Sequence, residues 1–179
     1  MTQRYTIRLA AGHHVRAIPA IEQAAAAMFS ETDLPAELRY LVTDVELIVE
    51  AQRHGRLWAA LDEKKKLVGF ALVRMVGRFA HLEEMDVHPD HARQGLGTRL
   101  LGAVIAWAKD GGHLGISLIT FRHLPWNAPF YERNGFVQMD EGHEFDCLRD
   151  LIREEANAGI EPSRRVAMLY EFRDAASSA

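Results

Sequence analysis

Hydrophobic and polar residues follow two different periods along the chain. Apolar residues recur at helical spacing over 15–29 and again over 35–52, which predicts two amphipathic helices in the N-terminal part. A short strand over 4–9 precedes them, and Gly55 is placed to end the second helix. His13 and His14 precede the first helical repeat and are expected to form an exposed helix start.

The pattern changes to that of β-strands after Gly55. Apolar runs bounded by polar turns predict strands at 57–61, 67–76, 80–87, 115–121, 136–139 and 165–172. Helical spacing returns between these runs and predicts helices at 95–110, 127–134 and 145–158. The alternation of strands and helices predicts an α/β or α+β fold with helices on both faces of one sheet.

Composition narrows the class of protein. The 179 residues suit one domain spanning 1–179, and 48% apolar residues predict a chain that folds. Cys147 is the single cysteine, which excludes an intramolecular disulfide, and the N-terminal segment lacks the apolar core of a signal peptide. We therefore expect a cytoplasmic protein that does not enter a membrane. The net charge of −4 argues against general nucleic-acid binding and favours a small-molecule partner.

The segment from Met85 to Leu101 carries the strongest chemical signal. It reads as the end of a strand, a polar loop, the turn Gly95-Leu96-Gly97 and the start of a helix. The first amides of a helix lack intrahelical acceptors and lie at the positive end of its dipole, while glycine lets an anion approach the backbone. The segment therefore predicts a phosphate site, to which Thr98 adds a hydroxyl group and Arg93 a positive charge.

Two common phosphate motifs do not fit this segment. Leu100 stands where G-x-G-x-x-G needs its third glycine, and no G-K-[ST] follows. The segment instead resembles the acyl-CoA signature of the GNAT N-acetyltransferases, [QR]-x-x-G-x-[GA], after a strand that ends in V-x-P. Ala92 occupies the first signature position, so a phosphate contact is missing there, and Arg93 or Gln94 is the expected substitute.

A second segment resembles the same family. Residues 127–136, N-A-P-F-Y-E-R-N-G-F, are similar to the family's A-x-x-[FY]-Y-x-x-x-G-F segment. The family's usual asparagine falls on Leu124, and Asn127 is the expected replacement. The resemblance covers residues 4–139 and implies the GNAT fold, a mixed, mostly antiparallel sheet splayed at the acyl-CoA site. It implies transfer of acetyl from acetyl-CoA to a primary amine, directly and through a ternary complex.

The resemblance also assigns roles to individual residues. It implies that Tyr131 protonates the leaving thiolate and that the backbone of Met85 and Val87 pairs with the pantetheine arm, while their side chains stay in the core. The predicted cofactor-binding residues are Met85, Val87, Arg93, Gln94, Gly95, Leu96, Gly97, Thr98, Asn127 and Tyr131.

The amine needs a base, because an alkylamine has a pKa of roughly 10. Glu84 is the first candidate for that base and Glu83 the second; strand periodicity places them on opposite faces. His81, on the same face as Glu83, is a third candidate. The alternative is that both glutamates are structural and pair with arginines or cap the sheet edge.

Other features of the sequence are weaker indications of function. The spacing His88-x-x-His91 spans a proline and offers no third ligand, so we expect no metal.

The acceptor is predicted to be a small molecule or a peptide. Family members often dimerise, and the C-terminal strand with Val166 and Tyr170 is the expected edge for a homodimer. The rival reading is a non-catalytic acyl-CoA-binding regulatory module, consistent with the departures at Ala92 and Leu124.

Overall fold

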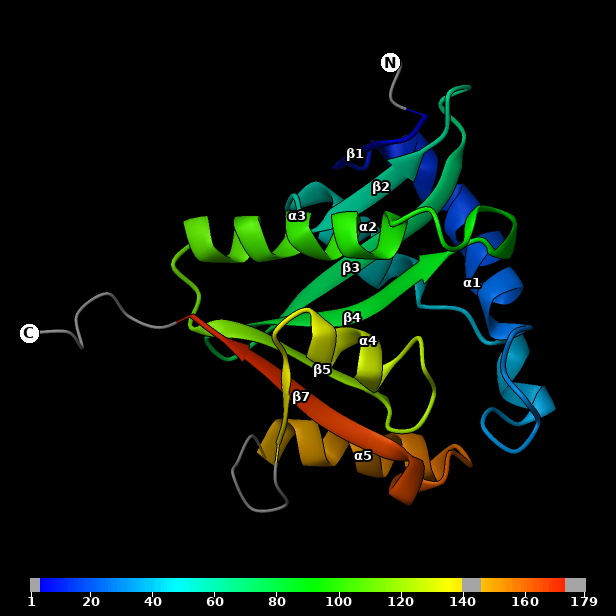
Figure 1. The fold of residues 1–179 in the computed structure, drawn as a ribbon, viewed down its shortest axis with the longest axis vertical. Helices are drawn as coiled ribbons and strands as arrows, with labels where there is room; N and C mark the ends of the chain where they lie inside the picture. Colours follow the sequence, from blue (N-terminus) through cyan, green and yellow to red (C-terminus); the bar gives the residue numbers. More distant parts are fainter. Residues whose placement is uncertain (1–3, 140–145, 173–179) are drawn as a thin grey trace, which may run out of the picture. The chain divides into compact units, whose positions relative to one another are not determined.

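The computed structural model describes residues 4–139 and 146–172. The chain forms two compact units, each with its own internal contacts. The first unit contains Met1–Arg74 and Leu82–Ile105, and the second contains Met75–His81 and Ala106–Ala179. Figure 1 follows the chain through its elements. Each unit is described by itself below.

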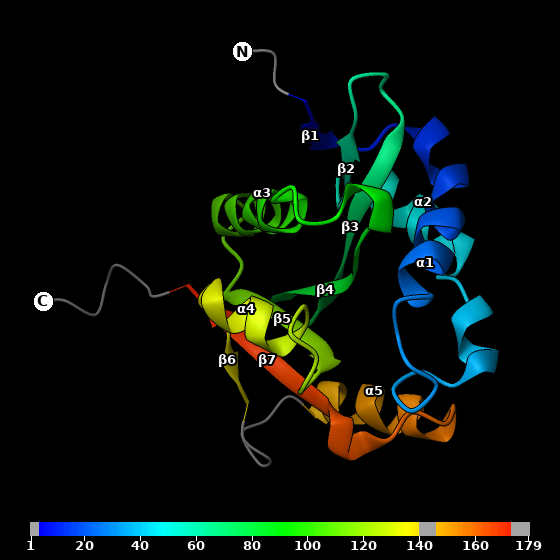
Figure 2. The same cartoon turned by 45° about the vertical axis from the view of Figure 1, so that its right-hand side comes forward.

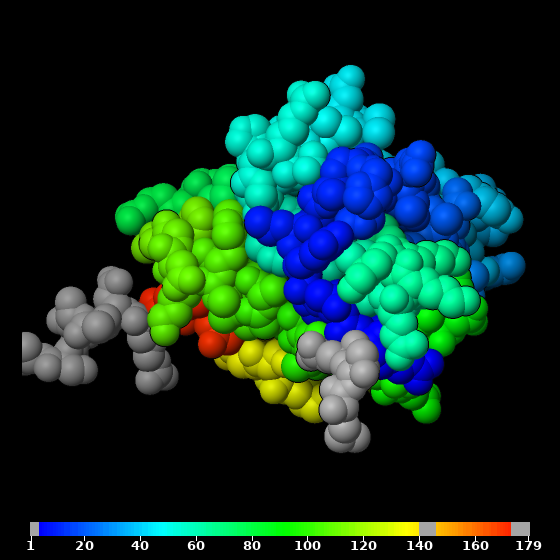
Figure 3. Space-filling model, turned by 90° about the horizontal axis from the view of Figure 1, so that it is seen from above, coloured from blue at the N-terminus to red at the C-terminus, as the bar shows by residue number. Residues whose placement is uncertain are grey.

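The strands of the first unit pair as the alternating pattern predicts. Strand β1 (Thr6–Leu9) lies antiparallel to β2 (Leu57–Leu61), and β2 lies antiparallel to β3 (Leu67–Val76). Strand β4 (Phe79–Val87) follows, and its last part belongs to this unit. The predicted bounds of β2 and β3 are confirmed. Figure 3 shows β1 in blue beside the blue-green turn that joins β2 to β3.

The helices before β2 are more broken than the sequence predicts. The expected helix over 15–29 begins as a 3-10 turn, η1 (Gly12–Ala17), and continues as α1 (Ile18–Ala26). The single helix predicted over 35–52 is wrong, because the chain forms η2 (Ala36–Tyr40), becomes extended at Leu41, and starts again as α2 (Val45–Arg53). The Asp44 side chain accepts a hydrogen bond from the Glu46 amide and thereby begins α2.

His14 is also a correction, because it is buried and not part of an exposed helix start. Only 4% of the residue is exposed, and its Nδ1 accepts a hydrogen bond from the Ala11 amide at 3.0 Å. The imidazole therefore takes the place of a side-chain cap at the beginning of η1. Burial lowers the pKa of His14, and the neighbouring charges of His13 and Arg8 lower it further.

The core of the first unit lies between η1, α1 and α2 on one side and strands β2 and β3 on the other. Its fully buried members include Ile18, Ile48, Leu57, Phe70 and Leu72. Figure 2 shows α1 and α2 on one face of β2 and β3, and α3 (Leu96–Asp110) beginning on the other face. The strands are therefore covered on both faces, which explains why their sequences are almost continuously apolar.

The second unit is built around strand β5 (Gly115–Phe121). Strand β5 lies parallel to the start of β4 at Ala80 and His81, and antiparallel to β7 (Arg165–Glu171) along its whole length. The short β6 (Val137–Gln138) adds to the other edge of β7. The helical elements of this unit are α4 (Ala128–Arg133), α5 (Asp146–Asn157) and η4 (Pro162–Arg164). Phe145, the first residue of the predicted last helix, lies outside the described residues.

These pairings bear on two predictions. The chain is a mixed α/β protein whose described strands are mostly antiparallel, as predicted. The C-terminal strand is not a free edge at Met168 and Leu169, because β5 and β6 lie on both sides of β7 there. Part of the predicted edge for a homodimer is therefore occupied by β6 of the same chain, and the homodimer itself stays a prediction. No helix of the described residues is long and apolar enough to cross a membrane.

Candidate functional site

The loop between β4 and α3 forms the predicted anion-binding turn. After β4, the 3-10 turn η3 (Pro89–His91) leads to Arg93 and Gly95, which both have positive φ, 57° and 73°. Helix α3 then begins at Leu96, and its first hydrogen bond onto the turn runs from the Arg99 amide to the Gly95 carbonyl at 3.1 Å. Glycine adopts a positive φ without the steric cost that other residues have, so the chain can turn into the helix at Gly95.

The amides at the start of α3 are available to a ligand. Within the described part of the chain, the backbone amides of residues 95–98 donate no hydrogen bond. Four N–H groups thus lie together at the positive end of a 15-residue helix. Arg93, Gln94 and Thr98 are exposed around them, while Leu96 is 1% exposed and anchors the turn in the core. This arrangement suits a diphosphate group.

Tyr5, His91 and Arg99 hold this turn in place through contacts that the sequence did not indicate. The Tyr5 hydroxyl lies 3.0 Å from His91 Nδ1, and the Arg99 guanidinium donates to the Tyr5 carbonyl at 3.1 Å. Tyr5 is 5% exposed, so the contact is mostly out of water. These partners are 86 and 94 residues apart in the sequence, and no local pattern could have revealed them.

The end of strand β4, just before the turn, lies close to the backbone of β3. Met85 and Val87 are half-buried, so their side chains are not fully in the core as expected. The β3 backbone approaches β4 closely here: a Cβ on Gly69 would lie 2.8 Å from the Asp86 carbonyl oxygen. The His88 amide donates to the Val68 carbonyl at 2.9 Å, and the chain turns away at Pro89.

The three predicted bases have different surroundings. Glu83 forms an ion pair with Arg74, with 2.5 Å between Oε2 and Nε. Glu84 is half-buried on the opposite side of the strand. His81 belongs to the second unit, where it is 3% exposed and its Nδ1 lies 3.0 Å from the Ser117 hydroxyl. His81 therefore joins β4 to β5, which favours a structural role.

Asp86 is a further carboxylate that the sequence analysis did not select. It follows Glu84 by two residues and is half-buried. Burial raises the pKa of Asp86 well above its usual value, and the negative charges of Glu84 and Glu22 raise it further. A charged residue two positions from a candidate base was the available signal in the sequence, because strand periodicity places the two on one face.

Tyr131 and Asn127 lie in the second unit. Tyr131 is 8% exposed on α4 and contacts Phe130 and Phe136 edge to face, with ring centroids 5.1 and 5.5 Å away. Asn127 precedes α4, and its carbonyl accepts from the Tyr131 amide at 3.1 Å. The side-chain amide of Asn127 has no partner among the described residues, so it is available to a ligand. Leu124 is 8% exposed and apolar, and cannot supply the missing amide.

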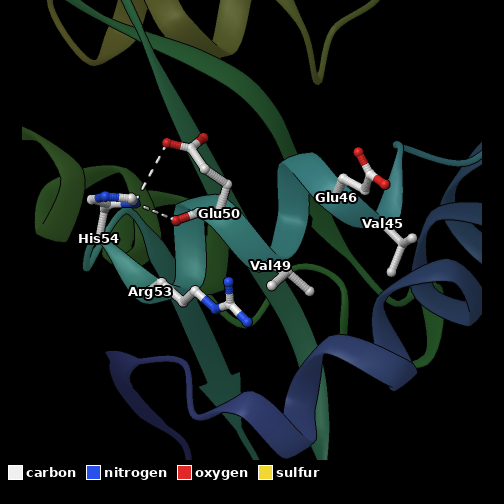
Figure 4. A pocket seen from close by; sticks show the side chains of 6 residues that line it. All are labelled: Val45, Glu46, Val49, Glu50, Arg53 and His54. Atoms are coloured by element: carbon white, nitrogen blue, oxygen red, sulfur yellow. Dashed lines mark hydrogen bonds and ion pairs between the residues drawn. The ribbon is translucent and has the colours of Figure 1, made fainter.

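A hollow on the exposed side of α2 contains none of these residues. It has a volume of about 350 Å³ and is lined by five residues of α2 and by the residue that follows this helix: Val45, Glu46, Val49, Glu50, Arg53 and His54. Figure 4 shows the contacts of His54, the C-cap residue, with Glu50 in the last turn of α2. We assign the hollow no chemical role. The described residues also contain no group of three or more side chains placed to hold a metal ion.

Comparisons with known proteins identify a family and a relative with similar sequences. The family model described as acetyltransferase (GNAT) family matches residues 18–136. The mycothiol acetyltransferase of Nocardiopsis dassonvillei is 32% identical over 110 residues, which is 58% of this chain and 32% of that protein. The chain thus matches about a third of the length of this relative.

Two solved structures share the fold at low sequence identity. The ribosomal-protein-S18-alanine N-acetyltransferase of Escherichia coli is 20% identical, with 98% of each chain covered and a TM-score of 0.68. The PaiA N-acetyltransferase of Thermoplasma acidophilum, solved in complex with coenzyme A, is 18% identical, with 95% of this chain and 100% of that chain covered and a TM-score of 0.66. These similarities establish the fold, and the chemistry must be argued from the residues of this chain.

Proposed function

The chain belongs to the acetyltransferase (GNAT) family, and on that premise we propose that it moves an acetyl group from acetyl-CoA to a primary amine. The transfer is direct and takes place in a ternary complex with a small-molecule or peptide acceptor. The observation that carries the proposal is the row of four amides at residues 95–98, which donate no hydrogen bond in the described chain. The family model runs through both units, which supports one GNAT domain over 1–179.

The pyrophosphate of the cofactor is assigned to the turn before α3. The amides of Gly95, Leu96, Gly97 and Thr98 donate to its oxygens, which are anionic and suit the positive helix end. Arg93 and Gln94 are exposed beside the turn and supply the polar contacts that Ala92 lacks. The backbone of Met85 and Val87 in β4 pairs with the pantetheine arm, which adds to the sheet as a further strand would. Asn127 offers its unpartnered amide as a further contact.

The chemistry needs a base, an acid and a held thioester. Acetyl-CoA supplies the activated acetyl group as a thioester. Glu84 is the first choice for the base, and Glu83, which forms an ion pair with Arg74, is the second. Tyr131 is the proposed acid and donates its phenolic proton to the thiolate as the C–S bond breaks. Tyr131 is buried on α4, and its ring packs against those of Phe130 and Phe136.

The alternative function is a non-catalytic acyl-CoA-binding regulatory module. It is favoured by the apolar residues at two family positions, Ala92 and the buried Leu124. The two functions differ in one measurable respect, since both bind acetyl-CoA but only the enzyme releases free CoA in the presence of an amine.

A thiol-release assay tests the proposal. The wild-type chain is incubated with acetyl-CoA and a panel of cationic, neutral and anionic amines at several pH values, beside Tyr131→Phe. The control is Tyr40→Phe, which removes the same hydroxyl from a residue that is 77% exposed in the other unit. Tyr131→Phe should lose about 100-fold or more of its turnover, and the control should lose none. Acetyl-CoA binding without turnover on any amine would favour the regulatory module.

A further inference from the structure

Tyr5, which lies just before β1, makes contacts on both sides of the turn that precedes α3. Its hydroxyl group shares a hydrogen bond with His91 Nδ1 at 3.0 Å, and the two rings meet edge to face with centroids 5.7 Å apart. Its carbonyl oxygen accepts a hydrogen bond from the Arg99 guanidinium at 3.1 Å. His91 precedes the turn and Arg99 follows it. We call Tyr5, His91 and Arg99 the Tyr5 cluster.

The tyrosine of this cluster has a fixed place in the first unit. Tyr5 is 5% exposed, and the Arg4 guanidinium lies over its ring, 5.4 Å from the centroid. The next four residues, Thr6–Leu9, pair with β2 and hold the backbone beside it. A hydroxyl group on a buried residue is costly to leave without a hydrogen bond. The position of Tyr5 therefore favours the turn conformation in which His91 reaches it.

The turn itself needs support from outside, because it contains a strained residue. Arg93 has a φ of 57°, a left-handed conformation that residues other than glycine adopt at a cost. Such a conformation persists where the surrounding structure holds the backbone. The His88 amide donates to the Val68 carbonyl of β3 at 2.9 Å and holds the chain before the turn. The Tyr5 cluster holds it at two further points.

We propose that Tyr5 is a positioning residue for the cofactor and keeps the turn in the shape in which the amides of residues 95–98 face the pyrophosphate. This inference rests on the proposed binding of acetyl-CoA at the turn. Tyr5 itself need not touch the cofactor, because its effect passes through His91 and Arg99. A contact that favours the binding-competent shape of a turn raises the affinity for its ligand to the same extent.

The coupling between Tyr5 and the cofactor works in both directions, because the effects of two linked contacts on each other are reciprocal. If the Tyr5 cluster favours the shape that binds acetyl-CoA, bound acetyl-CoA stabilises the cluster. Three amides report on this, those of His91, Ala92 and Arg99, which all donate backbone hydrogen bonds in or beside the turn. Their exchange with solvent deuterium measures how often the turn opens.

Tyr5→Phe tests the role, because it keeps the ring and removes the hydroxyl group. Tyr40→Phe is the matched control, since it removes the same group from a residue of the same unit that is 77% exposed. Calorimetric titration measures acetyl-CoA affinity, and turnover is measured with the best amine of the panel. In Tyr5→Phe the Kd and the KM for acetyl-CoA should rise about fivefold, the worth of one ordinary hydrogen bond, while kcat changes less than twofold. The control should match wild type.

Substitutions of His91 test whether the hydrogen bond is the cause. His91→Ala removes the partner of the Tyr5 hydroxyl, whereas His91→Asn keeps a polar atom close to the position of Nδ1. Acetyl-CoA affinity should fall about fivefold in the alanine variant and return to within about twofold of wild type in the asparagine variant. Tyr5→Phe combined with His91→Ala should bind no more weakly than His91→Ala alone, because both changes remove the same bond.

Hydrogen exchange separates a local effect on the turn from a loss of overall stability. In unliganded Tyr5→Phe, the amides of His91, Ala92 and Arg99 should exchange about fivefold faster than in wild type. The amide of Ile48, which is hydrogen-bonded in α2, should keep its wild-type rate. Saturating acetyl-CoA should slow the three turn amides in both proteins.

Two outcomes would overturn the inference. One is a Tyr5→Phe variant that binds acetyl-CoA within twofold of wild type; the other is exchange that accelerates at Ile48 as much as in the turn, which would leave Tyr5 a role in overall stability alone. If wild type binds no acetyl-CoA, the proposed function fails separately, and exchange in the unliganded chain judges the cluster. Faster exchange in the turn alone then supports positioning by Tyr5, and equal rates contradict it.

Discussion

Gly69 gives the sharpest test of how the fold positions the site. A Cβ added to this residue would lie 2.8 Å from the Asp86 carbonyl oxygen and 3.3 Å from Val87 Cα, whereas ordinary contacts begin at 3.4 Å. Strand β3 also pairs with β2, where Gly69 lies opposite Ala60, and this pairing limits how far β3 can move. Gly69→Ala must therefore push β4 away by about 0.6 Å, the difference between 3.4 and 2.8 Å.

The expected cost follows from this overlap. Inserting a methyl group into a packed region costs about 1–3 kcal/mol, and here the displaced atoms are backbone and cannot rotate away. Because Asp86 and Val87 are the displaced residues, acetyl-CoA should bind more weakly as well. Urea unfolding measures the free energy of unfolding, and calorimetric titration measures the affinity for acetyl-CoA.

Gly102→Ala is the matched control for this substitution. It adds the same methyl group to α3 in the same unit, where a Cβ would meet no atom within 4 Å. Alanine is the better helix former, so the control should gain up to about 1 kcal/mol. The reasoning would be refuted if Gly69→Ala unfolded within about 0.5 kcal/mol of wild type and bound acetyl-CoA equally well.

Three further predictions concern the turn, a helix start and a buried histidine. Arg93→Ala should weaken acetyl-CoA binding about 10-fold or more through the loss of a charged phosphate contact, while Arg53→Ala on α2 should leave it unchanged; equal affinities in calorimetry would remove Arg93 from the site. Asp44→Ala should lower the free energy of unfolding by about 1 kcal/mol in urea, because α2 loses its cap, and an unchanged midpoint would argue against the cap. The pKa of His14 is lowered in the folded chain, so the unfolded state binds more protons and stability should fall as pH drops below about 6.5. His14→Gln should reduce that slope of unfolding temperature against pH, and an identical slope would contradict the assignment.

The sequence was most informative where local pattern decides the structure. Strands 57–61, 67–76 and 115–121 have the predicted bounds, because most of their residues are buried and their apolar runs end at polar turns. The glycine turn before α3 was also predictable, since left-handed backbone at Gly95 and the helix start are both local features.

The remainder depended on contacts between distant residues. Helix α2 begins at Val45 and not at Pro35, because Asp44 caps it after an extended segment that the apolar repeat did not reveal. Tyr5 meets His91 across 86 residues, and Asp86 acquires its raised pKa from burial and from Glu84 and Glu22 together. Burial and long-range charge arise only from tertiary structure, so single-sequence patterns do not contain them.

One labelling experiment tests the central claim most directly. The wild-type chain is mixed with acetyl-CoA that carries an isotopically labelled acetyl group and with 1,3-diaminopropane, and both the amine and the protein are analysed by mass spectrometry. Direct transfer in a ternary complex predicts labelled acetyl on the amine, an equal amount of free CoA and no label on the protein. Label that stays in acetyl-CoA with every amine in the panel, or label that passes through a covalent acetyl-protein, would contradict the account.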